Sequence, residues 1–242
     1  MRQSSVDLTI YLKAVVVVLR NPAIVAGPLI ASSIAAVLGL MIPTMATGPL
    51  GGLNGGLAQL LVQLLFSVGL AFGIIAADLA IRRGRAPFAQ TWSDGERRLG
   101  DILMAALGLN FVIWVAVIVG GFFTPIGGLI LAAVALFFFI YTMPAAAIGG
   151  IPGGAALQVS VERSRANPLP TIGVFIAYAL VFFFLTGFLE TQTFDFLITL
   201  GVAASTIVTL VIHALIQAVC SAYVATVMAK TYSDIAYGRR WY

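Results

Sequence analysis

The sequence has little charge, one cysteine and one histidine, and each scarcity excludes a class of protein. Charged residues make up 9% of the 242 residues and hydrophobic residues 61%, whereas a soluble domain carries about 25% charged residues. No soluble fold of this length could bury so much apolar side chain, so we expect lipid around most of the chain. One cysteine excludes an internal disulfide and a cysteine-based metal cluster. A single histidine cannot build a metal site alone, so we predict no metal.

Recognisable catalytic motifs are also missing. The sequence has no phosphate-binding glycine loop, no dinucleotide fingerprint, no HExxH and no GxSxG. An intramembrane enzyme would need a nucleophile with its base, or a metal. His213, Cys220 and Ser221 are the main candidates, and neighbours on one helix make a poor catalytic geometry. We therefore predict that the protein is not an enzyme and binds no cofactor.

Four long stretches without charge indicate the membrane spans. They cover residues 21–77, 102–161, 166–189 and 196–229. A membrane-spanning helix needs roughly 20 apolar residues, so the first two stretches fit two spans each and the last two fit one each. Glycine and proline clusters at 47–56 and 120–128 mark turns, and the polar segment 190–195 separates the last two spans. The predicted spans are about 22–45, 57–81, 101–121, 127–147, 168–188 and 196–228.

This pattern predicts an all-α fold: a polytopic membrane helix bundle with about six transmembrane helices in a single domain, residues 1–242. All 13 lysine and arginine residues fall on one side of the threading, and the positive-inside rule makes that side the cytoplasm. We therefore expect an inner-membrane protein with both termini, and a tail at 229–242, in the cytoplasm. The net charge of +4 then reflects topology and contact with membrane lipids, not with nucleic acid.

Interfacial amphipathic helices are expected on the cytoplasmic side, at 1–20, 87–98 and 153–164. The first, third and fifth spans each follow an Asn or Asp, whose side chain can accept bonds from the free amides of a first turn. The predicted helix caps are Asn21, Asp101 and Asn167. An offset of 66 residues aligns 96–103 with 162–169, which leaves open both a repeat of helical hairpins and a coincidence of composition.

The last predicted span carries a row of polar residues: Thr206, Thr209, His213, Gln217 and Ser221. Spacings of three and four place them on one helix face, and a polar stripe in a membrane faces protein or water rather than lipid. The expected partners on other spans are Gln59, Gln63, Asn110 and Tyr178. The cluster is either a ligand-contact or proton-relay site near the bilayer midplane, or a seam of hydrogen bonds between helices worth roughly 0.6 kcal/mol each.

Three further features predict packing rather than chemistry. Asp78 lies one turn before Arg82, which favours an intrahelical ion pair over a proton-coupling carboxylate. Gly69 and Gly73 form a small-residue surface that lets another helix approach closely. Pro144 should kink the fourth span and free a backbone carbonyl around residue 140.

The layout resembles that of a known group. An amphipathic segment runs into "LRNP" at residues 19–22, and "E-R-x-x-x-N-P" occurs at residues 162–168. The chain is similar in this to a broad group of bacterial multi-pass proteins, which includes the membrane domain of some glycerophosphoryl diester phosphodiesterases. The resemblance implies a helical protein of the bacterial inner membrane. The soluble phosphodiesterase domain has no counterpart in this sequence, so its catalytic residues carry over to no position.

Two functions fit these observations. Sparse intramembrane polarity and abundant small residues favour a scaffold or accessory subunit, which would bind lipids and either a second copy of itself or other membrane proteins. The alternative is a small transporter or channel for a lipid or small metabolite, which would use the polar face of the last helix and a cavity lined by His213 and Gln217.

Overall fold

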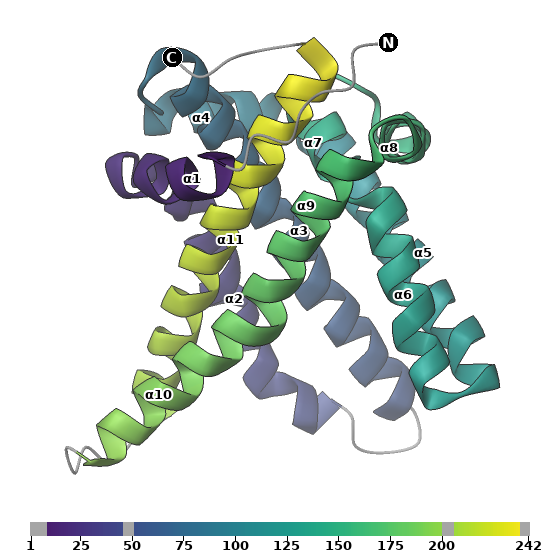
Figure 1. Ribbon diagram of the computed structural model, residues 1–242. Helices are drawn as coiled ribbons and strands as arrows, with labels where there is room; N and C mark the ends of the chain where they lie inside the picture. The colour runs from purple at the N-terminus through teal and green to yellow at the C-terminus, as the bar shows by residue number, and fades with distance from the viewer. Residues whose placement is uncertain (1–8, 46–50, 200–205, 238–242) are drawn as a thin grey trace.

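The described part of the chain is helical almost throughout (Figure 1). The computed structural model describes residues 9–45, 51–199 and 206–237, and no strand occurs among them. In chain order the helices are α1 (Thr9–Arg20), α2 (Ala23–Met45), α3 (Gly51–Arg83), α4 (Phe88–Arg97), α5 (Leu99–Phe123), α6 (Pro125–Phe139), α7 (Thr142–Ala147), α8 (Gly153–Ala166), α9 (Pro168–Ala179), the π-helical segment η1 (Leu180–Leu185), α10 (Thr186–Thr199) and α11 (Thr206–Tyr237). The predicted all-α fold is confirmed.

Among the described residues, six stretches are long and apolar enough to span a membrane, as predicted. They are Ala23–Leu40, Gly55–Arg83, Leu99–Phe123, Ile126–Ala147, Pro168–Asp195 and Ile207–Tyr237. The turn predicted at 120–128 lies where expected, because α5 ends at Phe123 and α6 begins at Pro125. Of the turn predicted at 47–56, residues 46–50 lie outside the described part, and α3 already begins at Gly51.

The turn predicted at 190–195 is wrong. Helix α10 continues through this segment to Thr199, and α11 begins at Thr206 rather than at the predicted residue 196. The segment has polar side chains but no glycine or proline, so nothing in it breaks a helix. The hydroxyls of Thr191 and Thr193 donate to carbonyls one turn earlier, at 2.9 Å and 2.7 Å, and so find partners inside the helix.

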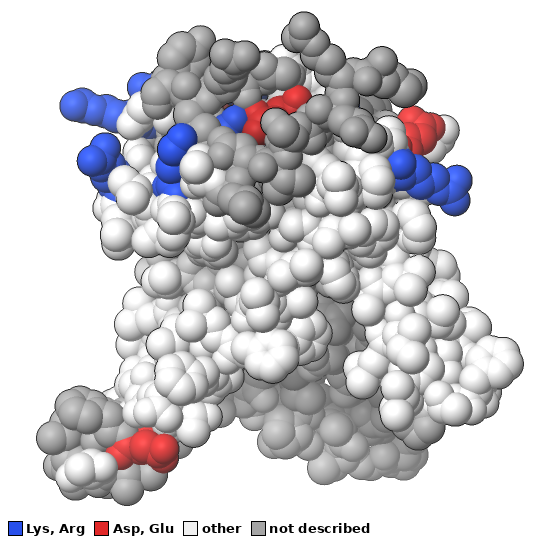
Figure 2. Space-filling view, in the orientation of Figure 1, with Lys and Arg blue, Asp and Glu red and all other residues white. Residues whose placement is uncertain are grey.

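The short helices gather at one end of the bundle, which we call the charged end. Helices α1, α4, α7 and α8 lie there beside the C-terminal part of α11, and the lysine and arginine side chains visible in Figure 2 lie there too. Helices α1, α4 and α8 correspond to the predicted amphipathic segments, and residues 1–8 of the first lie outside the described part. Helices α3 and α11 have 33 and 32 residues. At 1.5 Å per residue each measures about 50 Å, longer than a hydrocarbon core of about 30 Å.

The C-terminal part of α11 is not a free tail. A tail was predicted at 229–242, but α11 continues to Tyr237, and Lys230, Tyr232 and Ser233 are buried. Helix α11 packs there against α1, α3 and α7. The polar residues that suggested a tail are covered because the interfacial helices surround this end of α11.

Charged side chains buried at this end are paired within their own helices. Asp78 binds Arg82 in α3, as predicted, and Lys230 binds Asp234 in α11. The hydroxyl of Ser233 donates to Asp78 Oδ1 at 3.1 Å and so joins α11 to α3. A buried charge is costly unless it is paired and hydrogen-bonded, and both pairs meet that condition.

Small residues bring α2, α3 and α11 into close contact. A Cβ atom built at Gly69 would lie 2.4 Å from the Cβ of Ala31, and one built at Gly73 would lie 3.1 Å from the Cβ of Ala225. The hydroxyl of Ser32 in α2 also donates to a backbone carbonyl of α11 at 2.9 Å. The glycine pair predicted to serve packing therefore forms the contact between α3 and its two neighbours.

The two predicted asparagine caps have a different role. The amide of Asn21 donates to the carbonyl of Val17 at 3.0 Å, and the amide of Asn167 donates to the carbonyl of Arg163 at 3.3 Å. Asn167 occupies the N-cap position of α9, as predicted, but its side chain makes no capping bond there. The amide of each asparagine instead closes the end of the interfacial helix before it. Asn21 also accepts from the backbone N–H of Ala86 at 3.1 Å, which ties α1 to the loop between α3 and α4.

The predicted cap Asp101 is also corrected. Helix α5 begins at Leu99, so Asp101 lies within its first turn, where an acid still favours the helix dipole. Its Oδ1 accepts from the backbone N–H of Gly153, the first residue of α8, at 3.3 Å. The carboxylate thus binds the start of a neighbouring helix.

The fourth span is broken close to Pro144, as predicted, and serine side chains of α8 bond the backbone groups at the break. Helix α6 ends at Phe139, before the proline, and the carbonyl of Phe138 at the break accepts from side chains of α8. The hydroxyls of Ser160 and Ser164 donate to it at 3.0 Å and 3.1 Å, and Ser160 Oγ accepts from the N–H of Tyr141 at 3.0 Å. Backbone groups freed by a proline are satisfied in this way by a neighbouring helix.

We expect Gly69→Ala to destabilise the protein because its methyl group would overlap Ala31. Overpacking costs roughly 1–3 kcal/mol, so thermal unfolding in detergent, followed by circular dichroism, should occur at a lower temperature. Gly39→Ala is the matched control on α2, since a Cβ there meets open space. Equal unfolding temperatures for the two variants would contradict the close contact.

Candidate functional site

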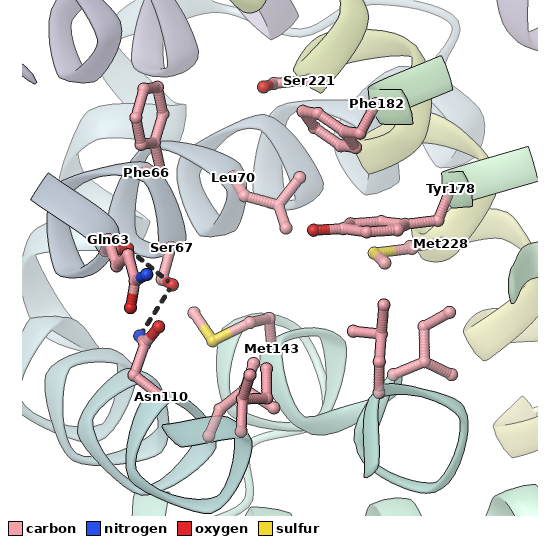
Figure 3. A pocket seen from close by; sticks show the side chains of 14 residues that line it. Gln63, Phe66, Ser67, Leu70, Asn110, Met143, Tyr178, Phe182, Ser221 and Met228 are labelled. Carbon is pink, nitrogen blue, oxygen red and sulfur yellow. Dashed lines mark hydrogen bonds between the residues drawn. The ribbon is translucent and has the colours of Figure 1, made fainter. Parts of the chain in front are cut away.

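A cavity of about 310 Å³ lies between the spans. Figure 3 shows it from close by. Its walls come from α3, α5, α6, α7, α9, η1 and α11, and its lining residues are Gln63, Phe66, Ser67, Leu70, Leu109, Asn110, Ile113, Leu136, Ile140, Met143, Tyr178, Phe182, Ser221 and Met228. Pockets for small ligands measure roughly 300–1,000 Å³, so the cavity is at the lower end of that range.

One wall of the cavity is a chain of hydrogen bonds between α3 and α5. The amide of Asn110 donates to Ser67 Oγ at 3.2 Å and to a carbonyl of its own helix at 2.8 Å. Ser67 in turn donates to the carbonyl of Gln63 at 2.9 Å, and Trp114 Nε1 donates to Gln63 Oε1 at 3.1 Å. Because these bonds fix the side chains, the wall presents polar atoms in a defined arrangement (Figure 3).

The opposite wall is apolar apart from two hydroxyls. Figure 3 shows Tyr178 reaching into the cavity with its hydroxyl toward the polar wall, beside Met143 and Met228. Ser221 supplies the second hydroxyl. The ring of Tyr178 contacts Phe182, with centroids 4.7 Å apart, at the start of the π-helical segment. None of the residues that line the cavity is charged.

The structure divides the predicted polar row on α11. Ser221 is buried and lines the cavity, whereas Thr209 and Gln217 are half-buried outside its lining. The side chain of Thr206 lies outside the described part. Of the predicted partners, Gln63, Asn110 and Tyr178 line the cavity and Gln59 is exposed on α3. The cavity predicted at His213 and Gln217 therefore lies further along α11, at Ser221.

His213 binds a residue that the sequence analysis assigned to a turn. Its Nδ1 lies 2.7 Å from Glu190 Oε1, which joins α11 to α10. The two side chains are 38% and 24% exposed, so neither is fully desolvated. Helix α11 is described from Thr206, so His213 lies two turns along its described part, and its predicted place near the bilayer midplane stays a prediction.

Three residues of these sites were missed, and two of them had a signal in the sequence. Ser67 follows Gln63 by four residues and Trp114 follows Asn110 by four, so both continue a polar face already identified. Glu190 had no such signal, because its polar neighbours suggested a turn. Within the described ranges, no group of three His, Cys, Asp or Glu side chains lies close enough to hold a metal ion.

The cavity lies close to a hollow in the side of the bundle. Helices α6 and α9 touch near the charged end, where the rings of Phe137 and Phe175 are 6.1 Å apart. Beyond that contact the α5–α6 hairpin diverges from α9 and α10 (Figure 1), and Figure 2 shows a hollow between them.

Comparisons of the chain with protein-family models, with curated proteins and with solved structures found no match. The resemblance to the phosphodiesterase membrane domain therefore stays a prediction from the sequence.

We expect a double-mutant cycle to detect the pair between α10 and α11. Glu190→Leu and His213→Leu, made singly and together, should give a coupling of roughly 0.6–1.7 kcal/mol in unfolding experiments, as polar contacts between membrane helices do. Glu190→Leu combined with Gln217→Leu, one turn further along α11, is the control and should be additive within about 0.5 kcal/mol. Additivity of the His213 pair would show that the contact is not formed.

Proposed function

We propose that the protein is a small membrane transporter or carrier whose substrate is an uncharged amphiphile. The observation that supports this most directly is the central cavity, with a polar wall facing an apolar one. This favours the second of the two functions expected from the sequence.

The lining of the cavity indicates the chemistry of its occupant. Amide and hydroxyl groups offer both donors and acceptors, and the remaining wall is aliphatic, aromatic or thioether. A charged group in such a site would lose its water without gaining a counter-ion, which is unfavourable. A molecule with one hydrogen-bonding head on an apolar body fits this lining, and methionine side chains adapt to bodies of different shape.

The route to the cavity is expected to be lateral. The hollow between the α5–α6 hairpin and α9–α10 opens to the side of the bundle, and the break in the fourth span lies at Ile140 and Met143 of the cavity lining. Breaks of this kind are common where membrane helices line a binding site. Uptake from the membrane would then need movement of α6 against α9.

Photolabelling tests the cavity with a defined probe. A diazirine-bearing diacylglycerol, added to the protein in lipid nanodiscs, should label residues of the cavity lining, as mapped by peptide mass spectrometry. Leu70→Trp, which fills the cavity, should reduce this labelling several-fold. Leu61→Trp, on the exposed side of the same helix, should leave it unchanged.

Two results would contradict the proposal. The first is labelling confined to the outer faces of the helices, which surrounding lipid alone would produce. The second is equal labelling by a diazirine-bearing phosphatidylglycerol at the same cavity residues, because that lipid carries a charged head.

We also propose the bacterial inner membrane as the location, with both termini in the cytoplasm. The support is the one-sided distribution of lysine and arginine. A green fluorescent protein fused after Tyr242 should fluoresce in a bacterial host, and alkaline phosphatase fused there should stay inactive. The reverse pattern would overturn this orientation.

The scaffold or accessory-subunit function, and the absence of enzymatic activity, stay predictions. Purification of the intact protein in mild detergent with a stoichiometric protein partner would favour the scaffold. In that case the Leu70→Trp substitution should leave the complex intact.

A further inference from the structure

A second, separate depression lies at the charged end, outside the central cavity. It measures about 660 Å³ and opens where the corner between α1 and α2 meets the loop between α3 and α4. Residues 20–23 and Ala26 form one wall, and residues 85–88 form the other. We call this depression the arginine groove, because an arginine stands on each wall.

The two walls of the arginine groove are fixed to each other. Asn21 is 7% exposed. Its Nδ2 donates to the carbonyl of Val17 near the end of α1, and its Oδ1 accepts from the backbone N–H of Ala86 on the opposite wall. Gly84 has φ +73°, a left-handed conformation that lets the chain turn back directly after α3. The spacing of the walls is thus set by the fold and does not depend on an occupant.

The charge of the arginine groove is not compensated by the described residues. Arg20 and Arg85 are both exposed, no acid lines the groove, and neither arginine forms an ion pair with a described side chain. The arginines that precede Arg85 in the chain do have partners. Arg82 binds Asp78, and Arg83 donates to Gln90 Oε1 at 2.8 Å. Two guanidinium groups on facing walls suit the oxygens of one phosphate group.

Apart from Asn21 the rest of the groove is apolar, and it lies beside aromatic side chains of the charged end. Ala23 and Ala26 leave a shallow channel along the start of α2, and Phe88 forms part of the other wall. Phe88 and Trp92 stack with centroids 6.0 Å apart and are 53% and 45% exposed, as aromatic residues at a membrane interface often are. Leu19, which precedes Arg20 in α1, is 78% exposed.

We propose that the arginine groove binds one anionic phospholipid of the cytoplasmic leaflet. The headgroup phosphate lies between Arg20 and Arg85, and an acyl chain follows Ala23 and Ala26 into the membrane. A zwitterionic lipid fits less well, because the groove offers two cations and no carboxylate for an ammonium group. Basic pockets on the cytoplasmic side of membrane helices bind phospholipid headgroups by the same chemistry.

Binding is measured on the intact protein in mild detergent by native mass spectrometry, with phosphatidylglycerol, phosphatidylcholine and inorganic phosphate as separate probes. The unaltered protein should retain one phosphatidylglycerol in preference to phosphatidylcholine. Arg20→Gln together with Arg85→Gln should weaken retention roughly tenfold or more, since each arginine near an anionic headgroup contributes appreciably. Arg97→Gln, an exposed arginine on α4 outside the groove, should have no such effect.

Ala26→Leu provides a second test that leaves the charge unchanged. It narrows the acyl channel, so retention of phosphatidylglycerol should fall while the circular dichroism spectrum stays the same. The proposal is overturned if Arg97→Gln weakens retention as much as the double substitution, because the effect is then one of total charge. It is also overturned if inorganic phosphate protects against thermal unfolding as well as phosphatidylglycerol does, or if both lipids are retained equally.

Discussion

Close contact of small residues between α2, α3 and α11 is the interaction on which the rest of the structure depends. In lipid the hydrophobic effect gives helices no reason to associate, so backbones must approach closely enough for van der Waals contact. Gly69 and Gly73 provide that approach. The three helices form a compact unit, and the long α3 and α11 carry it into the charged end, where α1, α4 and α7 pack around them.

The remaining spans, α5–α6 and α9–α10, diverge from each other beyond the charged end. Helix α10 stays beside α11 through the His213–Glu190 contact, and α5 is bonded to α3 through Asn110 and Trp114. The cavity lies between these spans. Polarity differs between the charged end and the cavity. At the charged end the buried Asp78 and Lys230 are paired with charged neighbours. The polar groups of the cavity wall are only neutral amides and hydroxyls. Away from the charged end lie the His213–Glu190 pair and the exposed Asp195, and the partial exposure of the pair fits a location outside the packed interior.

The number of spans and their fold class could be predicted because charge and hydropathy depend only on composition along the chain. Individual contacts could not, because they depend on which faces meet. Asn21 and Asn167 look like helix caps in sequence, yet their amides close the preceding helices. Gln63 and Asn110 were expected near His213, but both line the cavity further along α11, at Ser221. Glu190 was misplaced because a polar run without glycine or proline can remain helical when threonine hydroxyls bond back to the helix.

The serine bridge at the break in the fourth span has a mechanical consequence. Ser160 belongs to α8, which lies at the charged end, yet it holds Phe138 and Tyr141, next to Leu136, Ile140 and Met143 of the cavity wall. Arg163, one turn further along α8, lies 4.2 Å above the ring of Tyr232 in α11. A displacement of α8 would therefore move the backbone at Phe138 and Tyr141 in the interior of the bundle. The shape of the cavity is in this way coupled to the position of a helix that lies outside its lining.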